Sequence, residues 1–212
     1  MRMTRRPPAA VTGLLGLLLA PLAACSPGSG RSGAADSDRA ADSGSVGAAA
    51  AQGSGVERGH YLVEFGGCHD CHSPKVFTAA GPTPDTTRLL SGHPADAKLP
   101  AVPAAVLGPD KWGALTTPDL TAWAGPWGVS FTANLTPDPT GLRGWTAEQF
   151  IQTMRTGKHL GTGRAILPPM PWYDIGKLTD DDLRAVFAYL QSLKPVANRV
   201  ALPVPPARTA AR

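Results

Sequence analysis

Five consecutive residues, Cys68-His69-Asp70-Cys71-His72, carry the side chains most suited to chemistry in this 212-residue chain. The two thiols stand three positions apart, so that each can add to a vinyl group of one haem. The adjoining imidazole of His72 then stands where it can bind the haem iron as the proximal ligand. This C-x-x-C-H pattern predicts one covalent haem c, attached through Cys68 and Cys71.

A C-x-x-C pair also occurs in zinc sites and in thiol-disulfide oxidoreductases. A zinc site needs a second pair of ligands, but Cys25 stands far away, and His60, His93 and His159 are scattered singly. A thioredoxin-like motif lies between a buried strand and a helix, whereas residues 56–67 have the pattern of a short amphipathic helix. Haem attachment is therefore favoured, and a thiol oxidoreductase remains an alternative.

The N-terminus has the order of a secretory signal. Three arginines precede an apolar stretch from Ala9 to Ala20, and Leu22-Ala23-Ala24-Cys25 follows. This order resembles a bacterial lipoprotein signal, in which the cysteine is lipidated. Residues 1–25 are therefore expected to be the signal peptide and lipobox, with Cys25 as the lipidation site and an extracytoplasmic, membrane-anchored location. A plain signal peptide or an uncleaved anchor is the alternative, although the apolar stretch is shorter than the roughly 20 residues of a spanning helix.

Net charge gives no support to nucleic-acid binding. The formal charge is +4, but three of the 20 basic residues lie in the signal, which leaves 17 basic against 16 acidic side chains, a balance of +1. Arg199, Arg208 and Arg212 make residues 199–212 a locally basic tail, which we expect to be flexible.

Composition divides the remainder into a tether and one folded domain. Residues 26–55 contain mostly Gly, Ala, Ser, Asp and Arg, a composition that buries too little apolar surface to order the chain. A flexible tether of this length reaches roughly 30 Å. Residues 56–198 have the size of a single domain, and their single C-x-x-C-H motif and lack of internal repeats predict one haem.

Three helices are expected in this domain. The first, over 56–67, carries Tyr61, Leu62 and Phe65 with the spacing of one helix face and leads into the haem motif. The second begins at Thr146, where Gln149 completes a possible capping box, and ends near Gly157. Its apolar residues are Phe150, Ile151 and Met154.

The last helix has the clearest pattern. Thr179 is expected to cap it, and the acidic residues 180–182 suit the positive end of a helix. Apolar residues then recur at helical spacing, namely Leu183, Val186, Phe187 and Leu190, and Pro195 closes the segment.

The segment after the haem motif, residues 73–144, is rich in Pro and Gly and is expected to wrap the haem or to dock a partner. Only Gly128 to Leu135 has the pattern of a strand.

The order of these features resembles a class I cytochrome c. Three groups of residues resemble the cytochrome subunits or partners of bacterial membrane-bound dehydrogenases: Asn134-Leu135-Thr136-Pro137-Asp138, Phe150 with Arg155-Thr156-Gly157, and Pro168-Pro169-Met170-Pro171-Trp172 followed by residues 178–183. Members of that subgroup often carry two or three haem motifs, whereas this chain has one. The resemblance implies a mostly α, class I cytochrome c fold, with helices packed around one covalent haem and long Pro/Gly-rich loops.

Two methionines outside the signal are candidates for the sixth iron ligand. Met154 lies on the apolar side of an expected helix, where a thioether usually fills core space. Met170 lies between two prolines that disfavour helix and present it from a stiff loop. The resemblance places the ligand methionine before the last helix, so Met170 is preferred, and nothing in the spacing of His93 or His159 favours a histidine instead.

The resemblance implies that a proline carbonyl after the motif, assigned to Pro82, accepts a hydrogen bond from His72. Gly59 and Tyr61 are also expected to meet the last helix around Phe187, where a small residue allows close approach of the helices. Trp172 and Tyr173 are expected to shield the haem, to bond to a propionate or to fill the core.

These predictions together indicate an exported, membrane-tethered monohaem cytochrome that is an electron carrier and no enzyme. It would carry single electrons from a dehydrogenase or quinol-oxidising complex to an oxidase or another cytochrome. The alternative is a haem-based sensor or catalytic haem protein with a displaceable distal ligand.

Overall fold

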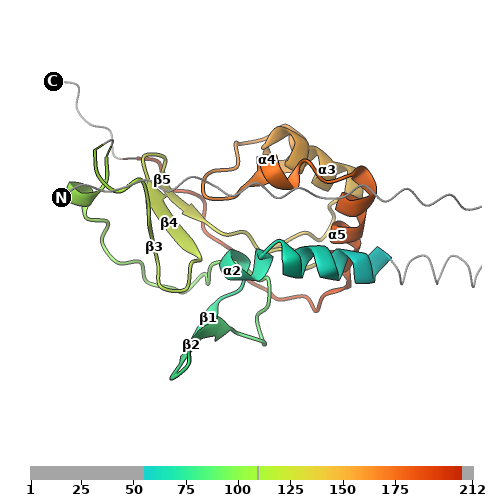
Figure 1. Cartoon of the computed structure of the whole chain (residues 1–212), viewed down its shortest axis with the longest axis horizontal. Helices are drawn as coiled ribbons and strands as arrows, with labels where there is room; N and C mark the ends of the chain where they lie inside the picture. Colours follow the sequence, from blue (N-terminus) through green and yellow to red (C-terminus); the bar gives the residue numbers. More distant parts are fainter. Residues whose placement is uncertain (1–54, 109, 207–212) are drawn as a thin grey trace, which may run out of the picture. The chain divides into compact units, whose positions relative to one another are not determined.

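The computed structural model describes residues 55–108 and 110–206, all of which belong to one compact unit of the chain, Ala41–Arg212. The predicted signal, the lipidation site Cys25 and the predicted tether up to residue 54 lie outside the described residues. In chain order, the elements are a helix over residues 55–65, α2 (Cys68–His72), β1 (Lys75–Thr78), β2 (Gly81–Pro84), η1 (Ala104–Val106), β3 (Leu115–Thr116), β4 (Ala122–Gly125), β5 (Gly128–Phe131), α3 (Ala147–Thr156), η2 (His159–Gly161), α4 (Trp172–Ile175) and α5 (Asp180–Ser192) (Figure 1).

The helix over 55–65 packs closely against α5. A Cβ atom added at Gly59 would lie 2.5 Å from the Ala185 carbonyl carbon and 2.8 Å from Tyr189 Cβ, so only glycine allows this approach. One turn later, Val63 is 1% exposed in the core. Arg58 Nε also donates to Asp182 Oδ1 of α5 over 2.9 Å. The prediction that Gly59 meets the last helix is therefore confirmed.

The predicted apolar face of this first helix is confirmed for Leu62, which is partly buried and packs against the core cluster, and is wrong for Tyr61 and Phe65. Tyr61 and Phe65 are 57% and 79% exposed, and their rings stack on each other at 6.0 Å rather than on α5. Because α5 lies on the side of Gly59 and Val63, residues 61 and 65 point away from it. The helix surface that contacts α5 is thus formed by Gly59 and Val63 and not by Tyr61 and Phe65.

Helices α3 and α5 begin and end close to their predicted bounds. Thr146 and Gln149 form the complete capping box of α3, and Gly157 ends the helix in the left-handed conformation, with φ of 65°. Thr179 accepts a hydrogen bond from the Asp182 amide at the start of α5. These local signals act over a few residues, which is why the sequence alone reveals them.

The core lies between α3, α5 and the helix over 55–65. Phe150 of α3 and Phe187 of α5 contact each other with ring centroids 5.6 Å apart. Around them the buried apolar side chains form one cluster: Val63, Leu90, Leu142, Phe150, Ile151, Met154, Leu183, Val186, Phe187 and Leu190. Leu90 extends this cluster into the segment that follows the motif.

Residues 73–144 contain more regular structure than the sequence indicates. The antiparallel hairpin of β1 and β2 follows α2 directly, and β3, β4 and β5 form a three-stranded antiparallel sheet (Figure 1). The strand predicted over 128–135 is confirmed for Gly128–Phe131. The strands are two to four residues long, so their weak sequence patterns are easily missed.

The segment predicted as a flexible tail contacts the sheet. Val204 pairs with Val129 through two backbone hydrogen bonds of 2.8 and 2.9 Å. The tail is thus attached to the domain as far as this residue, and residues 207–212 lie outside the described part. Within the described residues, no helix combines the length and apolar character needed to cross a membrane.

Candidate haem-attachment site

A glycine turn positions the C-x-x-C-H motif. The helix over 55–65 ends in Gly66 and Gly67, whose amides bond to the carbonyls of Leu62 and Glu64. Gly67 has φ of 64°, and a Cβ atom there would lie 2.9 Å from a carboxylate oxygen of Asp70. Glycine at this position lets the chain begin a second helix, α2, immediately. That short helix consists of the motif itself.

The two thiols of α2 are half-buried and free. Burial raises the pKa of Cys68 to about 11 and also raises that of Cys71 above its ordinary value. Disulfide oxidoreductases require the opposite shift, because their attacking group is the thiolate. Cys68 also packs against the main hydrophobic cluster. Cys68 thus lies at the edge of an apolar environment.

His72 is buried and held in one orientation. Its Nδ1 atom lies 2.8 Å from the carbonyl oxygen of Ala133, and a carbonyl can only accept a hydrogen bond, so Nδ1 carries the proton. Burial lowers the pKa of His72, which favours the neutral ring. The Nε2 lone pair is then left for a metal, which is the arrangement that histidine ligands adopt.

The prediction that Pro82 accepts this hydrogen bond is wrong. Pro82 is an exposed residue of β2, paired with Phe77. The acceptor comes instead from Ala133, beyond the end of β5, because the fold brings that distant segment beneath His72. No local signal in the sequence marks Ala133 for this role.

Lys75 is a further residue of the site that sequence reasoning missed. Its ammonium group donates to the carbonyl oxygens of His69, Asp70 and Ser73 over 2.9, 2.9 and 2.6 Å. These carbonyls belong to the C-terminal end of α2, where a cation is favoured. The sequence signal for this interaction was a lysine three positions after the motif, close enough to reach the last carbonyls of its helix.

The segment after the motif is joined to the core by Ser73. Its hydroxyl oxygen accepts from the Leu90 amide over 2.9 Å and lies 2.8 Å from His69 Nδ1. On the other side of the ring, His69 Nε2 is 3.2 Å from Glu64 Oε1 but is not aligned for a hydrogen bond. His69 is thus held through Nδ1 alone.

The two candidate methionines have different surroundings. Met154 is buried in the cluster on α3, in the packing role expected for it. Met170 is partly buried in the loop before α4 and borders the same cluster that Cys68 contacts. The loop is attached to the sheet by Ser130, whose hydroxyl lies 2.6 Å from the Pro168 carbonyl oxygen. Met170 thus lies in a loop at the edge of the cluster, whereas Met154 lies inside it.

The other candidates have structural contacts. His93 is 4% exposed, bonds to the Thr121 hydroxyl through Nδ1 over 2.8 Å and packs on Phe131. Trp172 covers Gly157 at the end of α3, whereas Tyr173 is exposed. Among the described residues, no three His, Cys, Asp or Glu side chains form a group able to hold a metal ion, so a zinc site gains no support.

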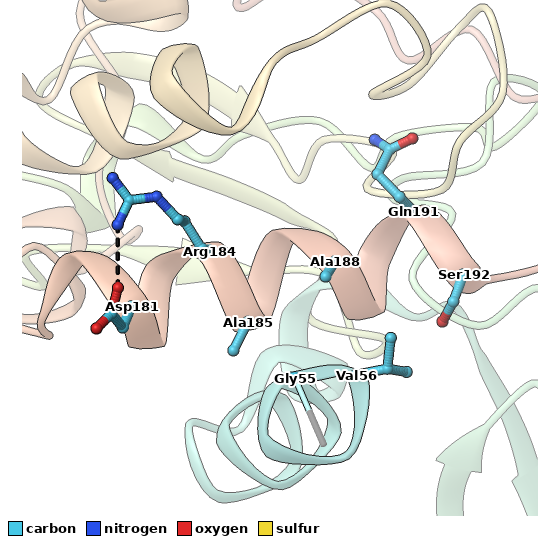
Figure 2. A pocket seen from close by; sticks show the side chains of 8 residues that line it. All are labelled: Gly55, Val56, Asp181, Arg184, Ala185, Ala188, Gln191 and Ser192. Carbon is cyan, nitrogen blue, oxygen red and sulfur yellow. Dashed lines mark hydrogen bonds and ion pairs between the residues drawn. The ribbon is translucent and has the colours of Figure 1, made fainter. Parts of the chain in front are cut away.

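A groove lies apart from the motif, between the start of the helix over 55–65 and α5. Its volume is about 550 Å³, and Figure 2 shows Ala185 and Ala188 on α5, Val56 on the neighbouring helix, and the Arg184–Asp181 ion pair at one end. None of its lining residues belongs to the C-x-x-C-H motif or to the methionine loop. It is therefore not part of the candidate site.

No protein-family model matches the chain. Its relatives include the cytochrome c subunit of alcohol dehydrogenase (quinone) from Gluconobacter oxydans, 38% identical over 74 residues, and a nicotinate dehydrogenase subunit from Pseudomonas putida, 36% identical over 84 residues. The fructose dehydrogenase cytochrome subunit of Gluconobacter japonicus is 26% identical over 155 residues.

These matches cover limited parts of the longer proteins. They span 34%, 37% and 71% of this chain, but 15%, 7% and 24% of the respective relatives. The similarity thus concerns one portion of each relative.

Proposed function

We propose that this chain, which resembles the cytochrome c subunits of dehydrogenases, carries single electrons as a monohaem c-type cytochrome. One observation supports the proposal most: the C-x-x-C-H motif forms a short helix in which His72 is buried and donates from Nδ1 to Ala133. The same helix offers two free thiols beside an apolar cluster. These residues fit a covalent haem c.

In this proposal, Cys68 and Cys71 would hold a haem through thioether bonds, His72 would bind its iron through Nε2, and Met170 would supply a thioether ligand from its loop. A neutral thioether favours ferrous iron relative to an anionic or harder ligand, and this ligand pair therefore raises the reduction potential. When bound, the haem iron supplies reversible one-electron chemistry.

The protein residues favour electron transfer over substrate chemistry. If His72 and Met170 both bound the haem iron, they would leave the iron no open position for a substrate. Both residues lie in segments held by hydrogen bonds to the sheet region, from His72 to Ala133 and from Ser130 to Pro168. Ligands held in this way need little rearrangement when the charge of the site changes, which supports rapid electron exchange.

We propose that the electron donor is a dehydrogenase or quinol-oxidising complex and that the acceptor is an oxidase or another cytochrome. The named relatives are subunits of dehydrogenases, which supports the donor assignment. We further propose that Cys25 carries a lipid and that residues 26–55 tether the domain 56–198 to an extracytoplasmic membrane surface. The domain would then reach partners within roughly 30 Å of its anchor.

Intact mass and optical spectra of the exported protein test the proposal. We expect a mass increment of one haem, a thioether-haem spectrum, and slow or weak binding of carbon monoxide to the reduced protein. Cys68→Ala and Cys71→Ala should impair attachment, and His72→Ala should prevent a normal holoprotein. A mass that matches the polypeptide alone, with two titratable thiols, would favour a thiol oxidoreductase, whereas rapid carbon monoxide binding would favour a haem sensor.

A further inference from the structure

Residues 130–133, at the end of β5 and just after it, contact both segments that carry the proposed axial ligands. Ser130 Oγ is 2.6 Å from the carbonyl oxygen of Pro168, two residues before Met170. The carbonyl oxygen of Ala133 is 2.8 Å from His72 Nδ1. One short stretch of backbone thus separates the two contacts.

The surroundings of Ser130 fix the direction of its hydrogen bond. The side chain is buried. Trp127 Nε1, which can only donate, lies 3.2 Å from Ser130 Oγ. Ser130 therefore accepts from Trp127, and its single hydroxyl proton is left for a carbonyl. Pro168 at 2.6 Å is a much closer acceptor than Trp123 at 3.4 Å.

The stretch is itself held on both sides. Ser130 pairs with Trp123 of β4 in the sheet register. The Thr132 amide donates to the Thr121 carbonyl over 2.9 Å, and the Thr132 carbonyl accepts from the His93 amide over 3.0 Å. A contact to this stretch is therefore a contact to a rigid support.

The methionine loop has few other attachments. On one side, the Ile166 amide donates to the Gly157 carbonyl over 2.8 Å, and on the other, Pro171 begins α4. Pro168 and Pro169 have no amide proton to donate. In the part of the chain that the structure describes, the bond from Ser130 is the only hydrogen bond that reaches residues 167–170.

We propose that Ser130 is a positioning residue for Met170. By holding the Pro168 carbonyl, its hydroxyl fixes the start of the methionine loop, and the backbone of residues 130–133 sets the spacing between this attachment and the bond to His72. This inference rests on the proposed function, and it gives the sheet of β3, β4 and β5 a role in positioning the proposed iron ligand. Loss of the hydroxyl should increase the fraction of molecules in which Met170 has left the iron.

Ser130→Ala in the haem-loaded protein tests this role. The methionine-to-iron charge-transfer band of the oxidised protein should weaken, and the apparent affinity for added imidazole should rise about tenfold, because a ligand binds only the methionine-free fraction. Ser130→Thr retains the hydroxyl and should restore both readouts. Thr132→Val is the matched control, because Thr132 is buried two residues away and donates to Thr121 instead. It should leave the imidazole affinity within about twofold of the original.

A second pair of variants tests the same role if Ser130→Ala does not fold. Ser130→Val and Ser130→Thr have nearly the same shape and differ in the hydroxyl, so a higher imidazole affinity for valine supports the role and equal affinities overturn it. Ser130→Ala with the band and affinity of Thr132→Val would also overturn it. Two other outcomes can be told apart from these. If the proposed function is wrong, the original protein carries no haem. If the Met170 assignment is wrong, Met170→Ala leaves the band unchanged.

Discussion

The imidazole of His72 and the backbone carbonyl of Ala133 are 61 positions apart in the sequence and 2.8 Å apart in the structure. The carbonyl fixes the proton on Nδ1, and a histidine that donates in this way is a stronger electron donor through Nε2. The position of Ala133 is therefore expected to affect both the stability of the site and its reduction potential.

Gly92→Ala tests the support of this carbonyl. A Cβ atom at Gly92 would lie 2.5 Å from the Thr132 carbonyl oxygen and 2.7 Å from that of Ala133. We expect the substitution to displace Ala133, weaken its bond to His72 and raise the reduction potential, as measured by voltammetry. The free energy of unfolding should fall by about 2 kcal/mol more in Gly92→Ala than in Gly144→Ala. Gly144 is the matched control because its φ of 83° resembles the 78° of Gly92, but it has open space around it. Equal effects of the two substitutions would contradict a role for crowding at Ala133.

Met170→Ala and Met154→Ala should separate ligation from packing. The first should retain covalent haem, lower the reduction potential and allow carbon monoxide to bind the reduced iron rapidly. The second should keep the spectrum and reduce the free energy of unfolding by about 2 to 5 kcal/mol, because it leaves a cavity in the core. Optical titration and chemical denaturation measure the two effects. An unchanged spectrum and potential in Met170→Ala would move the ligand assignment to Met154 or a histidine.

Gly59→Ala should disturb the contact between the helix over 55–65 and α5. The added methyl group would overlap the backbone of Ala185, so we expect a loss of about 1 to 3 kcal/mol in unfolding free energy, as measured by denaturant titration. Gly55→Ala lies on the same helix with no heavy atom within 4 Å of the new Cβ. This control should be neutral or slightly stabilising because alanine favours helix. Similar losses in both variants would argue against close packing at Gly59.

Lys75→Met should weaken the end of α2. It removes three hydrogen bonds to the carbonyls of His69, Asp70 and Ser73. We expect a loss of about 1 to 2 kcal/mol in the free energy of unfolding. Lys177→Met is the control, since the Lys177 side chain is 74% exposed and pairs only with Asp174 among the described residues; its effect should stay within about 0.5 kcal/mol. A loss as small as that of the control would show that Lys75 does not stabilise α2.

Asp85→Asn should alter the acid stability. Hydrogen bonds from Thr87 and Arg88 lower the pKa of Asp85 from 3.8 to about 2. A carboxyl with a lowered folded-state pKa stabilises the fold above its unfolded pKa, and this contribution disappears as the pH falls through the folded value. The advantage of the original protein over Asp85→Asn should therefore be complete above about pH 4 and shrink towards pH 2. Denaturant titrations across this range check it, and a constant difference would contradict it.

Local signals in the sequence determined much of the helical framework. Thr146 with Gln149, and Thr179 with Asp182, act over three residues, so both caps were predictable and both are present. The C-x-x-C-H motif is likewise local, because the spacing of its thiols and imidazole needs one helical turn. The sequence also separated Met170, flanked by prolines, from Met154 in a helix.

Only the tertiary structure decided which distant residues support the site. Ala133 rather than Pro82 accepts the hydrogen bond from His72, and Ser130 holds the loop that carries Met170, because the sheet of β3, β4 and β5 brings both residues close to these segments. Tyr61 and Phe65 remain exposed because α5 packs on the opposite side, at Gly59. A backbone carbonyl has the same chemistry at every residue, so no residue type marks the one that will accept; its position follows from how the whole chain packs.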